Sequence, residues 1–88
     1  MNYYKNENNI DIREWFMTEN PDDWAVISMF NALKYHVRAG FKEGEPEEKD
    51  LKKKWDYLND YAVVTSQTME EAIHDLHDNA ETFYNYEP

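Results

Sequence analysis

The chain has 88 residues, a formal net charge of −10 and no cysteine. This length corresponds to one domain, residues 1–88, and the missing cysteines exclude a disulfide framework and a thiolate metal site. No apolar run approaches the ~20 residues of a membrane span, and the polar N-terminus lacks the apolar segment of a signal peptide, so we expect a cytoplasmic protein without a membrane partner.

Residues 10–17 are predicted to form a short helix. Apolar side chains recur there at Ile12, Trp15 and Phe16, which is the three-and-four spacing of one helix face. The nine residues before this segment are polar and rich in asparagine, and we expect them to be frayed.

A longer helix is predicted over residues 21–38. Asn20 is expected to cap its N-terminus, Pro21 suits the first helical position, and Gly40 can adopt the left-handed conformation that ends a helix. The apolar side of this segment is wide, which predicts that it is the central helix. The apolar residues are Val26, Ile27, Met29, Phe30, Leu33 and Val37.

Two further helices are predicted over residues 46–62 and 68–83. In the first of them, one face carries Leu51, Trp55, Leu58 and Ala62. The second begins with Thr68 and Glu71 at the spacing of a capping box. It continues with a heptad-like seam suited to packing against another helix or another chain, formed by Met69, Ile73, Leu76, Ala80 and Phe83.

These segments predict an all-α fold, a small single-domain helical bundle of three main helices plus a short N-terminal helix. A chain of this size buries only a modest core. The seam and the three tryptophans, which are expected in the core or at an interface, supply more apolar surface than that core needs. We therefore expect a homo-oligomer.

A polar stripe runs along the helix predicted over residues 21–38. Asn31, Lys34 and Arg38 are three and four residues apart, so they share one face of the helix. An amide, an ammonium and a guanidinium in a row offer a surface for an anion such as phosphate. The alternative is that Lys34 and Arg38 pair with Asp50 or Glu48 of the next helix and fix the packing, and the sequence leaves both interpretations open.

The stripe is part of a longer pattern. Asn-x-x-Lys-Tyr-x-x-Arg-Ala-Gly-x-Lys runs from Asn31 to Lys42, and Asp-Leu-x-Lys-x-x-x-Tyr-Leu runs from Asp50 to Leu58. In this order and at this spacing, the two motifs resemble the core of the SaV-like family of small bacteriophage proteins. The resemblance covers about residues 10–62 and leaves the acidic C-terminal helix outside it.

The resemblance implies a bacteriophage protein that acts in the cytoplasm of an infected cell. A nucleoside-monophosphate kinase of a podovirus carries a similar core, so kinase activity is one implication. Together with the stripe, the resemblance predicts a nucleotide- or phosphate-handling role with the ligand residues Asn31, Lys34, Arg38, Lys42, Asp50 and Lys53. No P-loop motif or catalytic residue is evident, no cofactor is predicted, and magnesium would be needed only for phosphoryl transfer.

The uneven charge predicts a competing function. Residues 63–88 contain six acidic residues and neither lysine nor arginine. Such a surface disfavours duplex DNA and suits a basic partner. In this interpretation the protein is a non-enzymatic interaction protein that binds and inhibits a basic host protein by imitating nucleic-acid charge. The partner-binding residues would be Glu70, Glu71, Asp75, Asp78 and Glu81.

The same segment also raises the question of a metal site. Glu71 and His74 have the spacing found in di-metal helical bundles, which require further carboxylates from other helices. His74 and Asp78 fall opposite the apolar seam, so a solvated acidic face is expected and no metal is predicted.

Overall fold

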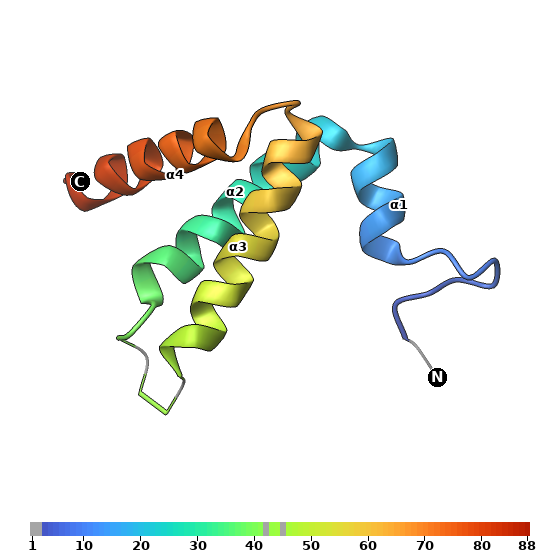
Figure 1. Cartoon of the computed structure of the whole chain (residues 1–88), viewed down its shortest axis with the longest axis horizontal. Coiled ribbons are helices and arrows are strands. Elements are labelled where there is room, and N and C mark those ends of the chain that lie inside the picture. The colour runs from blue at the N-terminus through green and yellow to red at the C-terminus, as the bar shows by residue number, and fades with distance from the viewer. Residues whose placement is uncertain (1–2, 42, 45) are drawn as a thin grey trace.

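The computed structural model describes residues 3–41, 43–44 and 46–88, and its regular structure is entirely helical. Four helices follow one another along the chain: α1 (Ile12–Glu19), α2 (Pro21–Arg38), α3 (Glu47–Val64) and α4 (Met69–Tyr84), as drawn in Figure 1. The all-α prediction is confirmed, and each helix lies within two residues of its expected bounds. Within the described ranges, no helix is long and apolar enough to cross a membrane.

The antiparallel hairpin of α2 and α3 is the centre of the molecule (Figure 1). Ala32 of α2 and Leu58 of α3 are fully buried between the helices, and Met29 and Ala62 extend this core. An alanine at the contact lets two helices approach closely. Because α2 also contacts α1 and α4, its predicted central position is confirmed.

The ends of the helices follow the expected signals with one exception. Pro21 is the first residue of α2, but the side chain of Asn20 makes no capping hydrogen bond, so that prediction is wrong. A single residue separates α1 from α2, and the backbone N–H of Asn20 instead completes the last turn of α1. Gly40 has a φ of 80°, as expected for a helix stop. Thr68 and Glu71 form the predicted capping box.

The apolar side of α2 is wider than the surface that its neighbours cover. Met29 is buried, whereas Val26 and Phe30 are 72% and 62% exposed. The tryptophans are predicted to lie in the core or at an interface, and Trp15 and Trp55 lie at the surface of this chain and not in its core. Helices α1 and α4 each contact only part of the hairpin, so several large apolar side chains remain at the surface.

Helix α4 buries Leu76 and Ala80 of the predicted seam together with Ala72, and Met69 and Ile73 of the seam are partly buried against the core. Its buried positions are Ala72, Leu76 and Ala80, and Phe83 is 54% exposed. Residues spaced by four form a row inclined to the helix axis, so a helix that buries such a row crosses its neighbour at an angle. In Figure 1, α4 accordingly diverges from the hairpin, on the side away from α1. The seam is predicted to pack against another helix or another chain, and within the described part of this chain no helix covers the ring of Phe83.

Truncation of Leu76 tests this placement of α4. Leu76→Ala should lower the free energy of unfolding by about 2–4 kcal/mol, since it leaves a cavity in the core. Phe83→Ala should change it by less than about 0.5 kcal/mol, because an exposed ring loses little on truncation. Urea denaturation measures both values. An equal loss for the two variants would support the heptad-like seam instead.

Candidate functional site

Three cations surround the ring of Tyr35 on one side of the hairpin. The Nζ atom of Lys34 and the guanidinium carbon of Arg38 each lie 4.7 Å from the ring centroid, and the Nζ atom of Lys53 lies 5.2 Å from it. On the same side, Tyr57 stacks parallel to Tyr35 with 6.2 Å between the centroids. Positive charges near an aromatic ring are attracted by its quadrupole. We call Lys34, Arg38 and Lys53 the cationic cluster.

Arg38 has a second role, because it pairs with a buried carboxylate. Its Nη2 atom donates to Oδ1 of Asp50 at 2.7 Å, and its Nε atom donates to Oδ2 at 3.4 Å. Asp50 is only 1% exposed, so its charge depends on a close partner. The pair joins the last turn of α2 to the first turns of α3. The structural interpretation of the stripe is thereby confirmed for Arg38.

Of the other predicted ligand residues, some belong to the cationic cluster and some lie outside it. Within the described ranges, no carboxylate lies at ion-pair distance from Lys34 or Lys53. The side chain of Asn31 donates to the carbonyl of Ile27 in its own helix, at 2.9 Å. Lys42 lies outside the described residues. The structure therefore brings together Lys34, Arg38, Lys53 and Asp50 from the predicted set.

A second charged network holds α1 against the hairpin. Arg13 donates through Nε to Oδ2 of Asp60 at 2.7 Å, and the indole N–H of Trp24 donates to the same oxygen at 2.9 Å. The guanidinium of Arg13 also lies 4.8 Å from the ring centroid of Tyr57. Sequence reasoning missed this network, because Arg13 and Asp60 are 47 positions apart and no local pattern links them.

The acidic residues of α4 do not all have the same environment. Asp75 is half-buried and accepts hydrogen bonds from the hydroxyl of Tyr61, at 2.6 Å, and from Gln67, at 3.1 Å. These bonds hold the pKa of Asp75 below its usual value. Burial, together with the bond to Asp75, raises the pKa of Tyr61 to about 12. Asp75 therefore attaches α4 to α3.

The remaining carboxylates of α4 point into solvent. Glu71 closes the capping box, and hydrogen bonds from the backbone and side chain of Thr68 lower its pKa. Glu70, Asp78 and Glu81 are exposed. On a helical projection these three lie opposite the buried row of α4. We call them the acidic face of α4.

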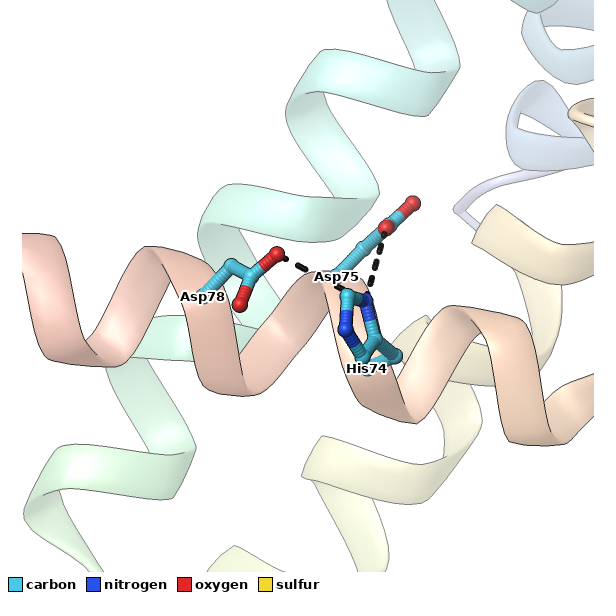
Figure 2. A group of neighbouring side chains, drawn as sticks. All are labelled: His74, Asp75 and Asp78. Atoms are coloured by element: carbon cyan, nitrogen blue, oxygen red, sulfur yellow. Dashed lines mark ion pairs between the residues drawn. The ribbon is translucent and has the colours of Figure 1, made fainter.

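An imidazole lies between two of the carboxylates of α4 (Figure 2). Nδ1 of His74 is 3.9 Å from Oδ1 of Asp75 and 3.5 Å from Oδ2 of Asp78. As expected, His74 and Asp78 face solvent, with side chains 74% and 65% exposed. All three residues come from one helix, and Asp75 already bonds to α3. We therefore describe the group as part of the acidic surface of α4, in which the imidazole pairs with the carboxylates when it is protonated.

Two histidines mark the place where α4 crosses α2. The rings of His36 and His77 are 5.8 Å apart. Burial lowers the pKa of His36, and the positive charges of Lys54 and His77 lower it further. The lowered pKa favours the neutral form of His36, which reduces repulsion from the ammonium group of Lys54.

An apolar groove of about 450 Å³ lies beside this crossing. We call it the α2–α4 groove. Its walls include Val26, Met29, Phe30 and Leu33 of α2, Tyr61 of α3 and Asn79 of α4. The sequence pattern identified these α2 residues as apolar, but it could not show which of them α4 leaves uncovered.

Comparisons with known proteins give a family without an assigned function. The chain matches the model of a family described as a protein of unknown function, DUF3310, over residues 2–59. It is 37% identical over 67 residues to the SaV protein of Lactococcus phage SK1, and 35% identical over 66 residues to the SaV protein of Lactococcus phage p2. These matches cover 75% and 74% of this chain and 52% of each relative. No solved structure matches.

The chain thus spans about half the length of the curated relatives it matches. The family match covers α1, α2, the cationic cluster and most of α3, and it ends before α4. The predicted resemblance to SaV-like phage proteins is confirmed. The predicted link to a nucleoside-monophosphate kinase has no support from these relatives, which are named only as SaV proteins.

Removal of the Arg38 guanidinium tests its structural role. Arg38→Ala should lower the free energy of unfolding by about 3 kcal/mol or more, because it leaves the buried carboxylate of Asp50 without this partner. Arg38→Lys should lower the free energy of unfolding by less, since an ammonium keeps the charge but not the forked geometry. Replacing both members, with Arg38→Met and Asp50→Leu, should recover most of the loss. Thermal and urea unfolding measure all three variants, and unchanged stability of Arg38→Ala would contradict the assignment.

Proposed function

The chain belongs to the DUF3310 family of SaV-like bacteriophage proteins, and we propose that it is a non-enzymatic interaction protein that binds a basic protein of the infected host. The observation that carries this proposal is the charge of the C-terminal part of the chain. Residues 55–88 contain neither lysine nor arginine, and the acidic face of α4 projects into solvent. A surface of one sign attracts a partner of the other sign and disfavours nucleic acid.

The acidic face suits binding because it is not needed for packing. Glu70, Asp78 and Glu81 lie opposite the buried row of α4, whereas Glu71 and Asp75 have structural partners. The partner-binding role therefore falls on three of the five residues that the sequence suggested. Because an acidic surface also competes with nucleic acid for basic sites, binding would inhibit a partner that uses such a site.

Neutralisation of the acidic face tests the proposal. A triple variant with Glu70→Gln, Asp78→Asn and Glu81→Gln should recover much less of the partner from a lysate of the bacterial host than the unaltered protein does. Recovery of the partner by the unaltered protein should fall to a similar extent when salt is raised from 0.1 M to 1 M. This change shortens the Debye length from about 10 Å to about 3 Å.

A matched control separates the position of the charges from their number. The variant with Glu7→Gln, Glu14→Gln and Glu19→Gln loses the same net charge from exposed positions near α1. It should recover the partner as well as the unaltered protein does. Equal recovery by both triple variants would remove the acidic face from the account.

A second candidate function is binding of a nucleotide or of phosphate by the cationic cluster. It is favoured by Lys34 and Lys53, which come from two helices and each place an ammonium group near the ring of Tyr35. Arg38 already binds Asp50, so the ligand would rest mainly on these two ammonium groups. No catalytic residue is proposed, and magnesium would matter only if a phosphoryl group were transferred.

Thermal unfolding with nucleoside mono-, di- and triphosphates, with and without magnesium, tests this second candidate. A ligand that binds only the folded protein raises its Tm. The rise should disappear in the variant with Lys34→Ala and Lys53→Ala and persist in the control with Lys5→Ala and Lys52→Ala, whose side chains are exposed elsewhere. Absence of any rise in the unaltered protein would exclude nucleotide binding under these conditions.

A further inference from the structure

We propose that the α2–α4 groove binds an amphipathic helix of the partner protein, with apolar side chains in the groove and basic side chains at its rim. This inference rests on the proposed function, because it specifies the form in which the basic partner is recognised. The bound helix would be basic, and its apolar side chains would add hydrophobic contacts in the groove to the charge attraction of α4.

The apolar component comes from a ridge on α2. Val26, Phe30 and Leu33 follow one another at steps of four and three residues, so they lie along one side of the helix over about 10 Å. Val26 and Phe30 are 72% and 62% exposed. The groove beside them continues to the half-buried Tyr61 of α3. This is the arrangement by which a groove receives residues spaced by three and four on a bound helix.

The charges around the groove are predominantly acidic. Asp22 precedes Val26 by one helical turn, and on α4 Asp75 and Asp78 precede Asn79 by one helical turn and by one residue. Among the residues that the structure describes, those lining the groove include neither lysine nor arginine. The nearest cation along the ridge, Lys34, directs its ammonium to the ring of Tyr35. Lysines or arginines beside the apolar stripe of a bound helix would therefore meet carboxylates at both walls.

The same charges argue against two other occupants. A second copy of this chain would bring its own net charge of −10 and another acidic rim to the contact. A nucleic acid would place phosphates against the carboxylates. A helix with one apolar side and basic flanks avoids both conflicts.

A synthetic peptide provides the direct test. The probe is a labelled peptide of about 18 residues made of leucine and lysine, with the leucines at helical spacing of three and four. Two control peptides have the same composition in scrambled order, or glutamate in place of lysine. Fluorescence anisotropy should show that each control binds at least about tenfold more weakly than the probe. The scrambled peptide separates groove binding from simple charge attraction.

Protein variants locate the contact. Phe30→Ala should weaken probe binding by about tenfold, and Val26→Ala should weaken it by a smaller factor. Phe41→Ala is the matched control, because Phe41 is 86% exposed in the loop after α2 and is not among the residues that line the groove. It should leave the affinity unchanged. Because all three side chains are largely exposed, the variants should fold, and circular dichroism checks this.

The outcomes separate this inference from the proposed function. Suppose that the triple variant of the acidic face weakens probe binding, whereas Phe30→Ala does not and the scrambled peptide binds as well as the probe. The acidic face then remains the binding surface, and the groove is overturned as the site. If neither the protein variants nor the scrambling of the peptide affects binding, the groove and the acidic face are both overturned as binding surfaces. If sedimentation finds a dimer that Phe30→Ala dissociates, the occupant is a second copy of this chain, and the basic helix is overturned.

Discussion

An arginine and a buried carboxylate hold the two longest helices together at the loop that joins them. Arg38 ends α2, Asp50 lies near the start of α3, and the pair replaces the hydration that the carboxylate loses on burial. Farther along the hairpin, Ala32 and Leu58 are fully buried and set the close approach of the helices. A chain of 88 residues buries a small core, so each of these contacts supports a large share of the fold.

The other two helices depend on this hairpin and leave part of it uncovered. Arg13 and Asp60 fix α1 on one side, whereas Asp75 and the buried row around Leu76 attach α4 on the other. Because α4 crosses obliquely, the ridge at Val26 and Phe30 remains at the surface. Arg38 of the cationic cluster stabilises the hairpin itself through Asp50. The acidic face of α4 and the exposed side chains of Val26 and Phe30 along the groove have no such structural role. This separation is why we place the function on α4 and the adjoining side of α2.

Much of the local structure could be predicted from the sequence, because local signals determine it. Spacing identified the helices, and Thr68 with Glu71 marked the start of α4 through bonds between near neighbours. The pairing of Arg38 with Asp50 was one of two open interpretations, since both residues lie close to the same short loop. The sequence did not predict the Arg13 to Asp60 contact or the exposure of Phe30. Both depend on the angles at which α1 and α4 meet the hairpin, and those angles come from tertiary packing.

The central claim is that the uncovered side of α2 and the adjacent surface of α4 together form the binding surface. Amide chemical shifts of the labelled protein, recorded during titration with the basic amphipathic peptide, test it most directly. The account predicts that the largest changes fall within residues 22–33 and 75–83. It also predicts that the amides around Tyr35 and Lys53 and those of α1 change little. Changes centred on the cationic cluster, or spread evenly over the surface, would contradict it.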